Sequence, residues 1–160
     1  MRWLSWQGNQ MPDSPFGFEK PEDSPGFLLW QTTMIWQRKI KKSLEPYEIS
    51  HAQFVIMAVL LWFNKHAYDT TQTGIINWTK LDKMTVSKSI KKLMTQGLLT
   101  QVEHAKDTRA KSVSLTEEGN KLIHKLVPIV ESIDAAFFGY IPVDDNQSLI
   151  RMLNKLAEQA

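Results

Sequence analysis

The sequence predicts a mostly α-helical protein with one small β-hairpin, an α+β arrangement. Three observations lead to this prediction. From Phe27 onward, apolar residues recur at spacings near 3.6, the period of a helix. Segments 98–103 and 111–115 flank a polar turn, as the two strands of a hairpin do. Capping residues stand where the periodic segments start or stop, such as Ser50 and Gly97.

Composition sets the broad class of the protein. The chain has 160 residues, 42% of them hydrophobic and 22% charged, which suits one compact soluble domain. No apolar run reaches the roughly 18 residues that a membrane span needs, and the first residues lack the apolar core of a signal peptide. The absence of cysteine excludes disulfides, a thiol nucleophile and a thiolate metal site. We therefore expect a cytoplasmic protein.

Charge is distributed unevenly along the chain. Segment 75–115 holds eight Lys or Arg and three Asp or Glu, a net charge of +5, while the other residues have a net charge of −3. A basic segment in an otherwise acidic chain is typical of proteins that bind a polyanion. The alternative interpretation of this basic segment is a solvated charged face with no partner.

Residues 1–26 are expected to form an arm that lies outside the main domain. They include four of the seven prolines and show no regular periodicity, which disfavours helices and central strands. The arm also carries Trp3, Trp6 and Phe16, which are unusual in a solvated linker. Either it packs on something, such as a partner subunit, or crystal contacts alone would order it.

Two helices are predicted before the basic segment. The first covers 27–45, with lysine and arginine on the side away from its apolar residues, and Pro46 ends it. Ser50 then begins the second helix, with Gln53 at the third helical position of a capping box. Because residues 54–62 are apolar all round, this helix should be buried on most sides.

The basic segment itself reads as two helices and a hairpin. A polar break at 70–73 precedes a short helix around 74–80. The next helix, 84–96, has an apolar stripe of Val86, Ile90, Leu93 and Met94, and Gly97 stands at the left-handed cap position. Strands at 98–103 and 111–115 follow, joined by the polar turn 104–110.

Two further amphipathic helices complete the chain. Thr116 caps the first, which runs to about Phe137 and should bend at Pro128. The second covers about 146–158 and presents four aliphatic residues on one face. The order of helix, helix and basic-tipped hairpin, set between other helices, is that of a helix-turn-helix followed by a wing.

At this point the sequence resembles the MarR family of bacterial transcription regulators over roughly residues 24–157. The sharpest match is LMTQGLL at 93–99, followed by DTRAKSVSLTEEG at 107–119. The second fragment keeps the family's wing pattern of Asp-x-Arg-x-Lys, a short strand and Leu-Thr-x-x-Gly. The sequence departs from the family in its long arm and in Asn77-Trp78-Thr79, where charged residues and alanine are usual. Trp78 is expected to pack against the scaffold rather than to contact DNA.

The resemblance implies a homodimer that binds double-stranded DNA at a roughly palindromic operator. Residues 27–160 would form one MarR-like domain, in which 27–45 and 117–160 are dimerisation helices. Residues 50–116 would form the winged-helix DNA-binding lobe, with 84–96 as the recognition helix in the major groove. Repression is the commoner mode among relatives, and activation stays open.

Polar side chains of the recognition helix are the predicted DNA contacts. Base edges are read near the N-terminal end of such a helix, where Thr85, Ser87, Lys88 and Ser89 stand. Lys83, Lys91 and Lys92 are expected to meet phosphates, which position a protein without reading sequence. Thr73, at the start of the preceding helix, offers its hydroxyl and that helix's N-terminus to another phosphate. The alternative for any single lysine is a solvated side chain.

Arg109 is the predicted minor-groove residue of the wing. A guanidinium on a narrow hairpin suits the focused negative potential of an A·T-rich minor groove. Asp107 is placed to hold Arg109 extended by a charge-assisted hydrogen bond, a role that the resemblance supports. Lys106 and Lys111 should flank it on phosphates.

The resemblance also implies a small aromatic or phenolic effector held between the dimer helices and the lobe. Trp30, Trp36, Phe54, Met57 and Trp62 fall on the helices that would bound such a pocket. Aromatic residues at helical spacing are more often core, so packing is the competing interpretation.

Other functions have little support. His51, His66, His104 and His124 are scattered and lack the spacing of a zinc site, and neither a Gly-rich phosphate loop nor a GxSxG motif occurs. We expect no cofactor, no metal and no enzymatic activity. The competing function is a winged-helix module that binds protein, which a steep salt dependence of DNA affinity would argue against. A regulator controlled by its abundance alone is a third alternative.

Overall fold

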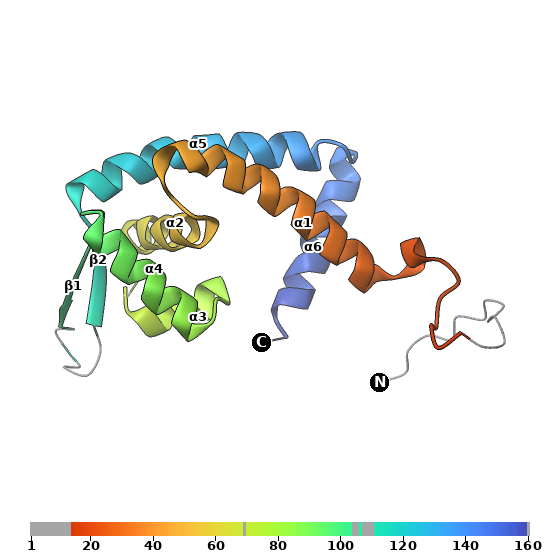
Figure 1. Ribbon diagram of the computed structural model, residues 1–160, viewed down its shortest axis with the longest axis horizontal. Coiled ribbons are helices and arrows are strands. Elements are labelled where there is room, and N and C mark those ends of the chain that lie inside the picture. The colour runs from red at the N-terminus through yellow and green to blue at the C-terminus, as the bar shows by residue number, and fades with distance from the viewer. Residues whose placement is uncertain (1–13, 69, 104–105, 107–110, 160) are drawn as a thin grey trace. The chain divides into compact units, whose positions relative to one another are not determined.

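The computed structural model describes residues 14–68, 70–103, 106 and 111–159 (Figure 1). The chain divides into two compact units, Met1–Lys39 and Ile40–Ala160. In the first unit, a 3₁₀ turn at Pro21–Asp23 precedes α1, Pro25–Leu44, which crosses the boundary. This helix begins two residues earlier than predicted, because Pro25 occupies the first helical position that favours proline and Ser24 accepts the Phe27 N–H at 3.2 Å.

The second unit contains the elements that the sequence predicted, in the same order. A 3₁₀ turn at Glu45–Tyr47 ends α1, and the capping box of Ser50 and Gln53 starts α2. The bounds of the following elements are α2 His51–His66, α3 Gln72–Thr79, α4 Lys83–Thr95, β1 Leu99–Glu103, β2 Lys111–Leu115, α5 Glu117–Phe138 and α6 Val143–Ala157. The mostly helical α+β prediction is confirmed.

Helix α2 forms the centre of the core. It contacts α3, α4, α5 and β2, and it buries Phe54, Ile56, Met57, Leu60 and Phe63. The elements that contact α2 bury the side chains of Ile75, Val86, Ile90, Leu93, Val113, Ile123 and Leu126. The predicted burial of α2 is therefore confirmed, except at Trp62, which is half exposed. The buried face of α4 is thus fixed, and its opposite face is presented to solvent.

The hairpin pairs β1 with β2 in antiparallel register, from Leu99 opposite Leu115 to Glu103 opposite Lys111. A third segment, which the sequence did not reveal, joins its outer side. Thr71 forms an isolated bridge with Ser112, and the Val113 N–H donates to the Thr70 carbonyl at 2.8 Å. The residues that lead into α3 are therefore hydrogen-bonded to the wing strand β2.

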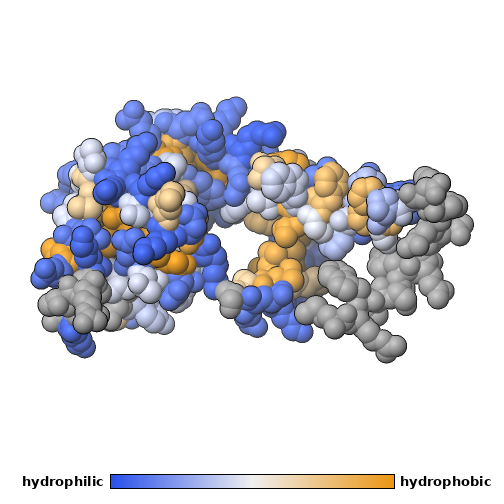
Figure 2. Space-filling view, turned by 60° about the horizontal axis from the view of Figure 1, so that its bottom comes forward, coloured by the Kyte–Doolittle hydropathy of each residue, from blue (hydrophilic) through white to orange (hydrophobic). Residues whose placement is uncertain are grey.

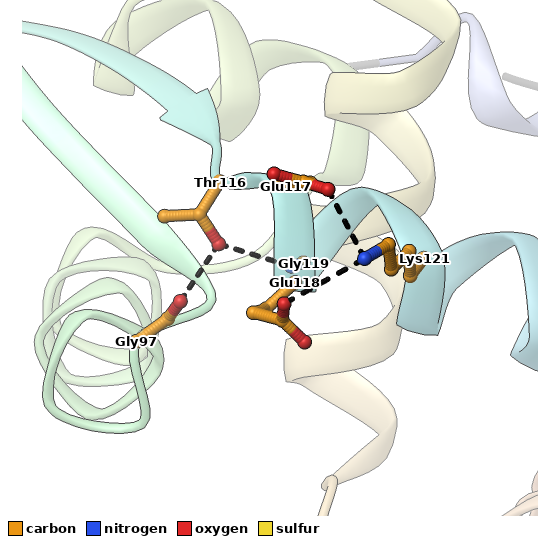
Figure 3. Close-up of polar contacts among 6 residues, drawn as sticks. All are labelled: Gly97, Thr116, Glu117, Glu118, Gly119 and Lys121. Atoms are coloured by element: carbon orange, nitrogen blue, oxygen red, sulfur yellow. Dashed lines mark hydrogen bonds and ion pairs between the residues drawn. The ribbon is translucent and has the colours of Figure 1, made fainter.

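A compact joint connects the end of α4 to the start of α5 (Figure 3). Gly97 has a φ of 72°, the left-handed value expected at this cap. The Thr116 hydroxyl donates to the Gly97 carbonyl at 2.7 Å and accepts the Gly119 N–H at 3.0 Å. Gly119 lies so close to the Leu98 carbonyl oxygen that a Cβ would overlap it. This contact explains in physical terms why glycine follows Leu-Thr-x-x in the sequence.

Helix α6 carries several exposed apolar side chains: Val143, Ile150, Met152, Leu153 and Leu156. Helix α5 runs through Pro128, and α6 begins three residues earlier than predicted because Asp144 and Asp145 lie in its first turn. No residue of α6 is buried, and Figure 2 shows hydrophobic side chains gathered along it. Among the described residues, no single helix has the length and hydropathy of a membrane span; α5 and α6 reach them only together, with a bend of 111° between them.

Candidate nucleic-acid interface

The N-terminal end of α4 is held by a side-chain cap. Asp82 accepts the Thr85 N–H at 2.8 Å through one oxygen and the Thr85 hydroxyl at 2.6 Å through the other. These two bonds, the hydroxyl's above all, hold the pKa of Asp82 below its ordinary value. The Thr85 hydroxyl proton is therefore committed to Asp82, and towards a ligand Thr85 offers its oxygen as an acceptor.

This cap gives a pH-dependent contribution to stability with a definite sign. Because the pKa of Asp82 is lower in the folded protein than in the unfolded chain, the contribution is complete above the unfolded pKa and is lost as pH falls through the folded pKa. We expect Thr85→Val, which removes the hydroxyl donor, to raise the pKa of Asp82 towards its ordinary value. NMR titration of the carboxyl carbon in both proteins measures this shift. An identical midpoint in the two proteins would mean that the hydroxyl does not stabilise the carboxylate.

The two faces of α4 differ sharply. Val86, Ile90 and Leu93 are buried, whereas Lys88, Lys91 and Lys92 are exposed on the other side. Ser87 and Ser89 are half-buried at the borders between these faces. Met94 was predicted to belong to the apolar stripe, but its side chain is 38% exposed. It follows Val86 by eight residues, and this spacing places it at the edge of the buried face of α4.

The remaining predicted contacts come from α3, the start of α4 and the wing. Lys83 is exposed in the first turn of α4, and Thr73 is exposed in the first turn of α3, where Thr71 rather than Thr73 is the cap. Lys111 is exposed opposite Glu103 at the end of the hairpin where the turn begins, and Lys106 is exposed in the segment between the two strands. The predicted pair Asp107 and Arg109 lies outside the described residues.

A buried polar link joins α4 to the start of α2. The Gln53 side chain is 1% exposed. Its Oε1 accepts the Ser50 N–H at 2.8 Å, and its Nε2 donates to Gln96 Oε1 at 3.0 Å. Gln96 in turn donates to the Glu48 carbonyl at 3.1 Å. Since these directed bonds hold the C-terminal end of α4 on the central helix, they fix where the lysine-bearing face points.

Removing this link should loosen α4. We expect Gln53→Leu to lower the free energy of unfolding by about 1–3 kcal/mol, because it removes the hydrogen bonds that this buried side chain makes to Ser50 and Gln96. The double variant Gln53→Leu/Gln96→Leu should lose less stability than the sum of the two single variants. Each single variant leaves the other side-chain amide without its partner, whereas the double variant removes both amides. Urea unfolding of the four proteins measures this coupling, and strictly additive losses would show that the two amides do not interact.

Comparison with known proteins agrees with this geometry. Residues 45–132 match the family model described as the ArnR1-like winged-helix domain. The chain is 37% identical over 121 residues to YdcH of Bacillus subtilis, an HTH-type transcriptional regulator, with 76% of this chain and 82% of YdcH covered. The chain belongs to the MarR family of winged-helix transcriptional regulators.

Solved structures share the fold of this MarR-family chain. A MarR-family transcriptional regulator from Rhodococcus sp. RHA1 superposes with a TM-score of 0.77 at 21% identity, covering 88% of this chain and 96% of that one. BpsR of Bordetella bronchiseptica, whose DNA binding is regulated by 6-hydroxynicotinic acid, superposes with a TM-score of 0.79 at 22% identity, covering 89% and 99%. The fold predicted from the sequence fragments is thereby confirmed.

The residues proposed for an effector pocket have different surroundings in this MarR-family chain. Phe54 and Met57 are buried in the core, whereas Trp62 stacks on His66 with ring centroids 4.0 Å apart. Trp30 is exposed and Trp36 is half-buried, and both belong to the first unit. Trp78 packs edge-on against Phe63 at 5.4 Å, in line with the scaffold role expected of it.

Sequence reasoning missed three features of this interface in the MarR-family chain. Asp82 precedes Thr85 by three residues, the spacing of a helix cap, so the cap of α4 could have been predicted from the sequence. The bond between Gln53 and Gln96 joins residues 43 positions apart, which no local pattern reveals. Met84 is 66% exposed and lies one helical turn before Lys88, a spacing that places it on the outer face of α4.

Proposed function

We propose that this chain binds double-stranded DNA as a homodimer at a roughly palindromic operator in the cytoplasm, and that it represses transcription there. The observation that carries the proposal is the exposed row of Lys88, Lys91 and Lys92 on a helix whose opposite face is buried in the lobe. Helix α4 enters the major groove, where these cations meet phosphates and base edges. Thr73, Lys83, Thr85, Ser87 and Ser89 complete the contact from the same side of the lobe.

A second copy of the chain supplies the other half of the DNA-binding surface. Helix α6 exposes Ile150, Leu153 and Leu156, and none of its residues is buried, which suits burial against a partner. The dimerisation helices are 27–45 and 117–160, and the lobe 50–116 binds DNA. Two-fold symmetry then matches two half-sites of the operator about one helical turn apart or a multiple of it.

Arg109 inserts into the minor groove from the wing, with Asp107 orienting it and Lys106 and Lys111 on the flanking phosphates. We expect Arg109→Ala to weaken operator binding by about tenfold or more while folding and dimerisation are retained. Fluorescence anisotropy at physiological salt measures the affinity, and sedimentation measures the dimer. Unchanged affinity would exclude this role for Arg109.

A small aromatic molecule releases the repressor from DNA, as the regulation of the similar protein BpsR by 6-hydroxynicotinic acid suggests. Trp30, Trp36, Phe54, Met57 and Trp62 are the proposed lining residues. Titration with a panel of hydroxylated aromatic acids, followed by tryptophan fluorescence and by operator release, tests this part. If no compound of a broad panel releases the operator, these side chains are structural only.

Selection of bound fragments from a random DNA pool tests the proposal as a whole, because it gives the operator and its half-site spacing together. We expect a two-fold symmetric consensus and an affinity that falls steeply with salt. A module that binds protein instead would enrich no consensus and would show little salt dependence on DNA.

A further inference from the structure

Met84 is a conspicuous feature of the surface that faces DNA in the proposed function. Among the described residues of the lobe 50–116, it is the most exposed large hydrophobic side chain, at 66%. It is the second residue of α4, between the capping residue Asp82 and Lys88. An apolar side chain so exposed contributes little to folding, so the fold itself gives no reason for methionine there.

The position of Met84 on the helix is that of a base-reading residue. With 3.6 residues per turn, Met84, Lys88 and Lys91 follow one another along the outer face, opposite Val86 and Ile90. Met84 is the member of this row closest to the N-terminal end of α4, the end whose side chains reach base edges in a helix-turn-helix. The lysines beyond it are farther from that end.

The chemistry of the major groove offers Met84 one matching group. Each base pair presents hydrogen-bond donors and acceptors there, and only thymine adds an apolar group, its C5 methyl. Methionine is flexible and polarizable, and its thioether is a weak acceptor, so it gains from contact with a methyl group rather than from a hydrogen bond. Lys88, one turn further on, supplies the donor that Met84 lacks.

We propose that Met84 is a specificity-determining residue that recognises a thymine C5 methyl in each half-site of the operator. The proposal rests on the proposed function, because it requires α4 to enter the major groove. Burial of one methyl group predicts about a fourfold preference for thymine over a base without the methyl, in each half-site. Because the dimer has two half-sites, the effect of both together is about fifteenfold.

Replacement of thymine by deoxyuridine tests this assignment, since it removes the methyl and keeps every hydrogen-bonding group. Each thymine pair of the selected operator is replaced symmetrically in turn, and Kd is measured for the wild type, Met84→Ala and Met94→Ala. We expect the wild type to lose about fifteenfold at one symmetric pair and Met84→Ala to be insensitive there. Met94→Ala, altered at the other end of the same helix, should keep the wild-type sensitivity.

Thermal unfolding is the control for folding. Because the Met84 side chain is exposed, we expect Met84→Ala to have the same Tm as the wild type, so that a change in its affinity reflects the DNA contact. A wild type indifferent to every replacement, or a Met84→Ala that keeps the full sensitivity, overturns the role of Met84 and leaves the proposed function standing. A wild type that selects no DNA sequence overturns the proposed function, and the role of Met84 with it.

Discussion

Replacing Lys91 and Lys92 by glutamine should weaken operator binding on the order of a hundredfold at about 0.1 M salt. Both side chains are exposed on the outer face of α4, where they reach phosphates in the proposed complex. A dimer would lose four such contacts, and each contributes about 0.9 to the slope of log K against log salt concentration, so the slope should become shallower by about 3 to 4. Anisotropy titrations at several salt concentrations measure both quantities.

Two matched variants separate contact from overall charge. Lys91→Arg/Lys92→Arg keeps the cations and should retain most of the affinity. Lys41→Gln/Lys42→Gln removes the same charge from exposed positions at the end of α1, and it should leave the slope nearly unchanged. Equal loss in the α1 and α4 variants would mean that the net charge of the protein, not α4, governs DNA affinity.

Gly119→Ala should lower the free energy of unfolding by roughly 2–4 kcal/mol. A Cβ at this position would overlap the Leu98 carbonyl oxygen, which also accepts the Thr116 N–H at 3.0 Å. The backbone must therefore separate where α4, the hairpin and α5 meet, and the hydrogen bonds of Thr116 are strained with it. Chemical unfolding followed by circular dichroism measures the loss.

Other glycines provide the comparison for this prediction. Gly97→Ala meets no neighbouring atom and should cost only about 1 kcal/mol, because alanine is disfavoured at a φ of 72°. Gly26→Ala, in the first turn of α1, would place its Cβ 4.0 Å from Ser24 Oγ, an ordinary contact, and should be neutral or slightly stabilising. If Gly119→Ala costs no more than Gly97→Ala, the joint yields without penalty and the close approach to Leu98 has no energetic consequence.

Much of this fold could be predicted from the sequence because its signals are local. Ser50 and Thr116 begin helices by accepting the N–H three positions later, and Gly97 ends one with a left-handed φ. Strand 111–115 was predicted with its observed bounds. The errors arose where burial decides: Met94 fits a helical stripe by spacing, yet the core does not extend far enough around α4 to cover it.

The candidate site was less predictable, because its geometry depends on contacts between distant segments. Lysines on α4 could be found from charge and periodicity alone. The bond of Gln53 to Gln96 and the bridge of Thr71 to Ser112 join residues about 40 positions apart, and no local pattern indicates them. The commitment of the Thr85 hydroxyl to Asp82 likewise depended on side-chain geometry.

The bridge between Thr71 and Ser112, with the bond from Val113 to Thr70, has a consequence for how the protein would meet DNA. It makes the start of α3 and the wing strand one rigid piece, so neither segment has to be immobilised when the complex forms. Association then loses little conformational entropy within the lobe, which favours a preorganised fit over a gradual one. For operators with differently spaced half-sites, we therefore expect the proposed dimer to adjust by movement of whole lobes rather than by changes within a lobe.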